Sequence, residues 1–224
     1  MKGNVPRQLV WDVPTRLFHW LIVGLVAFSW WSAEYDHLDW HLSAGLAVCG
    51  LLVFRILWGI VGTDTARFST FVKGPRAVWS YLRARGGTRV PSSPGHNPLG
   101  GWSVIALLLT LCVQVATGLF AVDVDGIESG PLSYLVDFDQ GRLAAAVHAA
   151  AFNLLLALVA LHVAAIMFYL VVKRRNLTRT MITGFQPDAE GSDTRVALAP
   201  WWRVLVAVLV SGLLMYGVER GFRF

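Results

Sequence analysis

Four histidines lie inside stretches of apolar residues, where ionisable side chains are rare. They are His19, His41, His148 and His162. An ionisable group at membrane depth is costly to bury and usually has a function. A single histidine of this kind could be a hydrogen-bonded packing residue, but four of them need a joint explanation.

The spacing of the last two histidines separates them into different sites. His148 and His162 are 14 residues apart. On a helix this spacing is about 40° short of four full turns and about 21 Å along the axis. The two rings therefore share one face of a helix but cannot bind the same metal ion. We expect two sites at different depths.

The first two histidines supply a partner at each depth. His19 lies near the start of one apolar stretch and His41 near the start of the next, which runs back across the membrane. We therefore expect His19 opposite His162, called the inner pair, and His41 opposite His148, called the outer pair. Imidazole is a common axial ligand of haem iron, so each pair predicts a bis-histidine haem. Without Cys or carboxylate ligands nearby, a bare zinc or copper ion is poorly supplied.

Two arginines and a glycine are expected around these sites. Arg55 follows His41 by 14 residues and faces the same interior. A haem propionate would offset the cost of burying this charge, and snorkelling to the headgroups is the alternative. Arg16, one turn before His19, could meet the same propionates or anchor its helix at the interface. Gly45, one turn after His41, leaves room for a planar ring, although small residues also serve helix packing.

Three other polar residues have simpler interpretations. Gln114 lies in the middle of an apolar stretch and is expected to hydrogen-bond between helices. His37 precedes His41 and could compete with it as a ligand, but His37 lies in an acidic loop. His96 is expected to be solvated in a polar loop.

The composition shows what kind of element must position these residues. The chain has 224 residues, of which 55% are hydrophobic and 15% charged, against about 25% charged in soluble domains. Apolar stretches long enough to cross a bilayer as helices recur five times. They cover about 16–33, 41–62, 102–122, 143–172 and 200–218. We predict an all-α integral membrane helical bundle, with a four-helix di-haem core and a fifth C-terminal transmembrane helix.

Several classes of protein are excluded by this pattern. The two cysteines, Cys49 and Cys112, lie in apolar stretches and form no CxxC or CxxCH motif. Structural zinc, a thioredoxin-type site and covalently attached haem therefore have no support. The motifs GxGxxG, GxSxG and HExxH of soluble enzymes are also absent, as is a P-loop.

The net charge of +5 is accounted for by membrane topology. Residues 1–15, 63–101 and 173–198 contain 13 Lys and Arg, whereas residues 34–40, 123–142 and 219–224 contain 3. Basic loops remain in the cytoplasm. The bias predicts a cytoplasmic N-terminus and a periplasmic C-terminus, and it removes any need for a nucleic-acid partner.

The motifs around the histidines resemble those of the bacterial cytochrome b561 family. VWDVPTRLFHWL at residues 10–21 is similar to the first-span signature, and HLSAGLAVCGLLVFRILWG at residues 41–59 to the second-span pattern. His148 and His162 match the fourth-span pair. The family includes the b-type cytochrome subunits of nickel-iron hydrogenases and the haem-bearing anchor of respiratory formate dehydrogenase. The resemblance, over about 10–175, implies two non-covalent haem b groups that exchange electrons with quinone.

These observations predict a transmembrane electron carrier of the bacterial inner membrane. We expect a di-haem domain over 1–175, a cytoplasmic linker over 176–198 and a transmembrane helix over 199–224. The expected partners are membrane lipid, quinone, and a periplasmic cytochrome c or a hydrogenase or dehydrogenase subunit docked on the acidic outer loops. One alternative is a stand-alone quinol-oxidising cytochrome that passes electrons to oxygen. Others are a histidine-based proton channel or transporter without haem, and a scaffold subunit without a cofactor.

Overall fold

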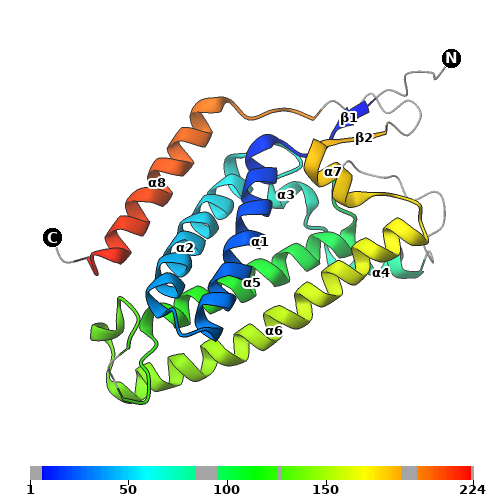
Figure 1. Cartoon of the computed structure of the whole chain (residues 1–224). Helices are drawn as coiled ribbons and strands as arrows, with labels where there is room; N and C mark the ends of the chain where they lie inside the picture. The colour runs from blue at the N-terminus through cyan, green and yellow to red at the C-terminus, as the bar shows by residue number, and fades with distance from the viewer. Residues whose placement is uncertain (1–6, 84–94, 126–127, 188–195, 223–224) are drawn as a thin grey trace.

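Five long helices dominate the computed structural model, which describes residues 7–83, 95–125, 128–187 and 196–222 (Figure 1). Within these residues, five helices are long and apolar enough to cross a membrane. They are α1 (Val13–Glu34), α2 (Leu38–Val61), α5 (Pro98–Phe120), α6 (Phe138–Val171) and α8 (Trp201–Glu219). Each corresponds to one predicted stretch, so the prediction of an all-helical membrane bundle is confirmed.

Capping residues explain why three helices begin earlier than their apolar stretches. The Asp12 carboxylate accepts a hydrogen bond from the backbone N–H of Thr15 at the start of α1. Asn97 caps α5 in the same way, and Asp137 forms a capping box with Gln140 at the start of α6. Side-chain oxygens at these positions satisfy N–H groups that have no partner inside the helix. The helices therefore start at polar residues that a hydropathy pattern does not include.

The helices pack as two neighbouring pairs with a fifth helix at the side. Helix α1 packs against α2, and α5 packs against α6, while α2 also contacts α5 and α8. Figure 1 shows α8 on the far side of α2 from α6. Buried apolar side chains such as Phe18, Leu52, Trp58, Leu111 and Leu155 form the shared core. The remaining long faces are exposed and apolar, as expected for helices that contact lipid.

Short elements gather at the end of the bundle where α1 begins (Figure 1). Strand β1 (Arg7–Leu9) pairs antiparallel with β2 (Phe185–Pro187). Helices α3 (Phe68–Phe71), α4 (Pro75–Arg83) and α7 (Leu177–Thr183) lie in the connections at this end, whereas the 3-10 helix η1 (Ser133–Leu135) lies at the opposite end, before α6. The linker expected over 176–198 thus contains α7 and β2, and its residues 188–195 lie outside the described part of the chain.

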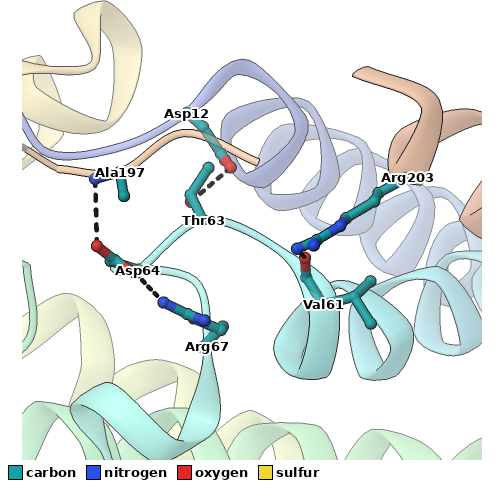
Figure 2. Close-up of polar contacts among 7 residues, drawn as sticks. All are labelled: Asp12, Val61, Thr63, Asp64, Arg67, Ala197 and Arg203. Atoms are coloured by element: carbon teal, nitrogen blue, oxygen red, sulfur yellow. Dashed lines mark hydrogen bonds and ion pairs between the residues drawn. The ribbon is translucent and has the colours of Figure 1, made fainter. Parts of the chain in front are cut away.

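A group of polar contacts fixes the start of α1 to the end of α2 (Figure 2). The second carboxylate oxygen of Asp12 accepts hydrogen bonds from Thr63 Oγ1 at 2.7 Å and from Trp58 Nε1 at 3.0 Å. Asp12 and Trp58 are both buried. Because a buried carboxylate must be hydrogen-bonded to be tolerated, these donors stabilise the junction.

The same junction also holds the segment that leads into α8 (Figure 2). Asp64 forms an ion pair with Arg67 and accepts a hydrogen bond from the backbone N–H of Ala197 at 3.2 Å. Arg203 Nη1 donates to the backbone carbonyl of Val61 at 2.9 Å. The last carbonyl groups of a helix have no partner within it, so Arg203 satisfies the C-terminus of α2 while it attaches α8.

Candidate functional site

The four histidines of the apolar stretches form two pairs between helices. The ring centroids of His19 on α1 and His162 on α6 are 6.5 Å apart. Those of His41 on α2 and His148 on α6 are 6.0 Å apart. These are the pairs expected from helix direction and depth, and α6 contributes one histidine to each.

The separation of the rings suits a metal between each pair. Two imidazoles on opposite sides of one metal have ring centres about 6 Å apart, because each metal–nitrogen bond is about 2 Å and each ring centre lies about 1 Å beyond the nitrogen. The observed distances of 6.5 and 6.0 Å match this value. No group of three or more His, Cys, Asp or Glu able to hold a metal ion occurs among the residues that the structure describes. The donor set is therefore two imidazoles, as in a bis-histidine haem.

Hydrogen bonds fix the tautomer of both outer histidines. His41 Nδ1 lies 2.8 Å from the backbone carbonyl oxygen of Ser29 on α1, and His148 Nδ1 lies 2.8 Å from that of Gln114 on α5. A carbonyl oxygen can only accept, so each Nδ1 carries the proton. The lone pair is therefore on Nε2, the nitrogen that would bind a metal. At His148 this lone pair accepts a hydrogen bond from the side-chain amide of Gln114, which a bound metal would displace. A carbonyl partner at Nδ1 is usual for metal-binding histidines.

A cavity of about 320 Å³ lies between the outer histidines. His41, His148, Gly45, Gly118 and Gln114 are among its lining residues, and most of the others are apolar. A methyl group at Gly45 would meet no atom within 4 Å, so the space beside Gly45 is open. Cofactor sites are mostly apolar and of roughly this size or larger. The donor set, the tautomers and the open face at Gly45 together fit a haem.

Gln114 contacts a histidine of the outer pair directly, which its position in the sequence does not predict. Its carbonyl accepts from His148 Nδ1, and its side-chain Nε2 lies 3.0 Å from His148 Nε2. Gln114 Oε1 is buried and has no hydrogen-bond partner. Gln114 does bond between helices as expected, but its partner is a candidate ligand. The only sequence signal was its polarity in the middle of an apolar stretch.

The inner histidines lack such carbonyl partners. His19 Nδ1 is buried without a hydrogen bond, although the ring contacts Trp20 edge to face at 4.9 Å. Buried polar atoms in native proteins are nearly always satisfied. The inner pair therefore has the ring spacing of the outer pair, at 6.5 Å, without a carbonyl partner at His19 Nδ1.

Arg55 is buried close to the inner pair rather than extended to the headgroups. Its side chain is 3% exposed, and Nη1 donates to the carbonyl of Ala66 at 3.2 Å. The guanidinium carbon lies 4.9 Å from the ring of Phe68 and 6.0 Å from that of Phe18. These contacts stabilise the cation. Phe18 precedes His19 in the chain, and His96 is affected by the charges of both Arg55 and His162, so Arg55 lies at the inner-pair end of the bundle.

Arg16 contacts the connection after α6. Its Nη1 donates to the carbonyl of Ile182 in α7 at 2.6 Å, and its Nε is buried without a partner. A side chain at Gly184 would contact this guanidinium group. Arg16 therefore helps to fix α7 and β2 against α1, a contact that neither of its two expected roles included.

The expectation that His96 is solvated is wrong. Its ring centroid lies 4.7 Å from those of Trp11 and Phe71, and its Nδ1 is buried without a hydrogen bond. Burial, together with the nearby charges of Arg55 and His162, lowers the pKa of His96 to about 3. The turn before α5 folds back over Trp11, just before α1, and over Phe71 of α3, which a pattern of local polarity does not reveal. His37, by contrast, is exposed at the turn between α1 and α2.

Comparisons with known proteins match most of the chain. A family model described as prokaryotic cytochrome b561 matches residues 10–184. The probable Ni/Fe-hydrogenase 1 B-type cytochrome subunit of Escherichia coli strain K12 is 26% identical over 166 residues, covering 60% of this chain and 69% of the relative. The protein of the same name from Escherichia coli O157:H7 has the same identity and coverage. No solved structure matches the chain significantly.

Proposed function

This chain belongs to the prokaryotic cytochrome b561 family, and on that premise we propose that it carries electrons across the membrane through two bis-histidine haem b groups. The family expected from the motifs at residues 10–21 and 41–59 is confirmed, and the chain is a multi-pass membrane cytochrome. The observation that supports the finer proposal is the pairing of four histidines from apolar helices into two sites.

In this proposal each histidine pair holds one iron by its imidazole nitrogens. Haem supplies one-electron chemistry when it is bound. His19 and His162 would hold the inner group, and His41 and His148 would hold the outer group. The 14-residue spacing on α6 puts the two candidate ligands of that helix about 20 Å apart along its axis.

Three further residues complete the two sites. Arg55 and Arg16 offer donors to the propionates of the inner group, and burial of Arg55 beside Phe18 and Phe68 supports this role. Arg16 retains donor capacity beyond its bond to Ile182, since its Nε has no partner. Gly45 leaves the space that the outer ring occupies.

We propose quinone on one side and a periplasmic redox protein on the other as exchange partners. The relatives are called B-type cytochrome subunits of a Ni/Fe-hydrogenase, which favours a hydrogenase subunit over a dehydrogenase subunit or a cytochrome c. The acidic residues Asp36, Asp123, Asp125 and Glu128 lie in the connections on the outer-pair side of the bundle, and Asp39 lies in the first turn of α2 beside them. A basic surface of the partner would be steered toward them.

The proposed orientation puts the N-terminus in the cytoplasm of a bacterium and the C-terminus in the periplasm. The bias of 13 to 3 basic residues between the two sets of loops supports it. Alkaline phosphatase is active only when exported, so its fusion after residue 224 should be active and a fusion after residue 83 inactive. The reverse result would contradict the orientation.

The decisive experiment is haem extraction with a reduced-minus-oxidised spectrum of the purified chain. We expect two low-spin, non-covalent haem b per chain. His162→Ala should lose the inner haem and His148→Ala the outer one, while the matched control His37→Ala, at an exposed turn, should keep both. One haem or none in the unaltered chain would contradict the pairing, and ion transport by colourless protein would favour the channel. Quinol oxidation by oxygen with the purified chain alone, as fast as in membranes, would favour the stand-alone oxidase.

A further inference from the structure

The two carbonyl groups that orient the outer histidines each accept a second hydrogen bond. The carbonyl of Ser29 accepts from His41 Nδ1 at 2.8 Å and from Ser32 Oγ at 2.9 Å. The carbonyl of Gln114 accepts from His148 Nδ1 at 2.8 Å and from Thr117 Oγ1 at 3.2 Å. In both helices the hydroxyl belongs to the residue three positions after the carbonyl.

A shared carbonyl weakens each of the bonds that it accepts. When an imidazole Nδ1–H donates to a carbonyl, its Nε2 becomes a stronger electron donor to a bound metal. A second donor on that carbonyl draws away part of its negative charge and so reduces this effect. A weaker ligand stabilises ferric iron less, and hydrogen bonding around the ligands is a recognised control of haem potential.

We propose that Ser32 and Thr117 are positioning residues that raise the reduction potential of the iron held by His41 and His148. They act through the carbonyls of Ser29 and Gln114 and do not contact the iron. This inference rests on the proposed bis-histidine haem. Full burial of Ser32, at 0% exposure, supports it, because no water competes for its hydroxyl.

The hydroxyl of Ser29 has the opposite effect. Ser29 Oγ lies 3.1 Å from His41 Nδ1, whose proton is already assigned by the carbonyl, so this hydroxyl acts as a second acceptor. A second acceptor strengthens the donor character of the ring. Removing Ser29 Oγ should therefore raise the potential, whereas removing Ser32 Oγ should lower it.

These effects belong to the outer pair alone. His19 Nδ1 has no hydrogen-bond partner, and no shared carbonyl is found at His162 within the residues that the structure describes. The inner group therefore serves as an internal reference in the same molecule. A general disturbance of the fold would shift both reduction potentials, whereas the proposed effect shifts only that of the outer group.

Potentiometric titration of the haem absorbance in purified protein tests the proposal. The component to be followed is the one that disappears in His148→Ala. Ser32→Ala should lower its midpoint potential and Ser29→Ala should raise it, with the other component unchanged. Thr117→Val should lower it by less than Ser32→Ala does, for two reasons. Thr117 Oγ1 also donates to the carbonyl of Val113 at 2.7 Å, and it lies 3.5 Å from His148 Nδ1, where as an acceptor it has the weaker, opposite effect.

Two controls separate this effect from a structural one. Thr117→Ser keeps the hydroxyl and should keep the potential of the unaltered chain. Thr110→Val removes another buried hydroxyl of α5. This hydroxyl donates to the carbonyl of Ala106 at 2.9 Å, and no histidine bonds to that carbonyl, so the substitution should shift neither potential.

The possible failures are distinguishable. Two haems with an outer potential unchanged in Ser32→Ala, or shifted in the same direction by Ser29→Ala and Ser32→Ala, would overturn the inference and leave the proposed function intact. One haem or none in the unaltered chain would overturn the proposed function itself. Should Ser32→Ala lose haem, the opposed signs of Ser29→Ala and Thr117→Val decide the question.

Discussion

Gly45 and Gly118 line the same cavity but face different surroundings. A methyl group at Gly118 would lie 2.9 Å from Cε1 of His148, so substitution there displaces the ring. A methyl group at Gly45 would meet nothing within 4 Å and would only narrow the cavity. Gly118 therefore preserves the position of the His148 ring, a candidate ligand, and Gly45 preserves the open space in the cavity.

Gly45→Ala should leave the fold intact and remove or reduce the outer haem while the inner haem remains. Alanine favours a helix over glycine by up to about 1 kcal/mol, so lost haem would not reflect a weaker helix. Haem content and thermal unfolding in detergent are the measurements. Gly212→Ala, also with nothing within 4 Å but on α8, is the control and should keep both haems. Full haem content in Gly45→Ala would contradict the role of Gly45.

His96 predicts a loss of stability in acid. Its pKa is lowered to about 3 in the folded protein by burial and by the charges of Arg55 and His162, whereas a histidine in the unfolded chain titrates near 6.5. Between these two pH values the unfolded chain binds a proton that the folded chain does not. Stability is therefore unaffected above about pH 6.5 and falls as the pH decreases toward about 3.

His96→Phe should remove this part of the acid sensitivity. The free energy of unfolding should decrease from pH 7 to pH 4 in both proteins. The decrease should be smaller in the variant than in the unaltered chain by about 3 kcal/mol. Denaturant unfolding in detergent at several pH values measures the difference. His37→Phe, at an exposed turn, is the matched control. Equal pH dependence of His96→Phe and the unaltered chain would contradict the prediction.

At the residue scale, the four candidate ligands could be singled out from the sequence, whereas their hydrogen-bond partners could not. His19, His41, His148 and His162 stood out because an ionisable group in an apolar stretch is costly, and their helical spacing gave the pairs. The environment of His96 could not be predicted, because Trp11 and Phe71 reach it only through the path of the chain. The carbonyl partners of the outer histidines could not be predicted either. Every residue has a backbone carbonyl, so the sequence does not distinguish the two that accept from His41 and His148.

At the scale of elements, Asp12 joins two helices. It caps α1 through Thr15 and accepts from Trp58 and Thr63 at the end of α2, and it is only 6% exposed. Asp137 caps α6 with the same geometry but is exposed. Two aspartates thus make the same cap, and only one of them also satisfies buried donors from another helix.

Asp12→Ala should therefore cost much more stability than Asp137→Ala. Loss of a cap costs about 1 kcal/mol, and each buried donor left without its charged acceptor adds about 1–3 kcal/mol. We expect a loss of about 3–7 kcal/mol for Asp12→Ala and about 1 kcal/mol for Asp137→Ala. Unfolding in detergent, followed by circular dichroism, compares the two. Similar losses in both variants would show that the contacts with α2 contribute little.

The apolar stretches predicted the five long helices, but the short elements could not be predicted from hydropathy. Helices α3 and α7 have only 4 and 7 residues, too few for a periodic pattern to be recognised. Strands β1 and β2 are separated by most of the chain and exist only because α1 and α7 bring them together. Their formation depends on tertiary contacts rather than on local propensity.

At the scale of the whole molecule, α6 sets the distance between the two sites. Its 34 residues exceed the roughly 20 needed to cross a bilayer, and it contributes His148 and His162, one to each pair. Helices α1 and α2 each supply one opposing histidine from opposite ends of the bundle. A single helix with two candidate ligands on one face thus sets the spacing of both proposed sites, whereas α8 carries no histidine.

This arrangement predicts that α8 is dispensable for haem binding. Among the long helices, α8 packs against α2, on the side away from α6. It is attached by the bond of Arg203 to Val61 and by burial of Ala207 and Ser211. A chain that ends after residue 198 should keep both haems and both potentials, because all four candidate ligands lie within the proposed domain of residues 1–175.

The truncated chain should nevertheless unfold at a lower temperature, since it exposes the apolar face of α2 that α8 covers. Haem content, the potentials and thermal unfolding in detergent are the three measurements. His162→Ala in the full chain provides the contrast, with the inner haem lost and α8 retained. If truncation instead removed a haem, α8 would be needed to hold α2, and with it His41, in position. The proposed boundary between the di-haem domain and the C-terminal helix would then be wrong.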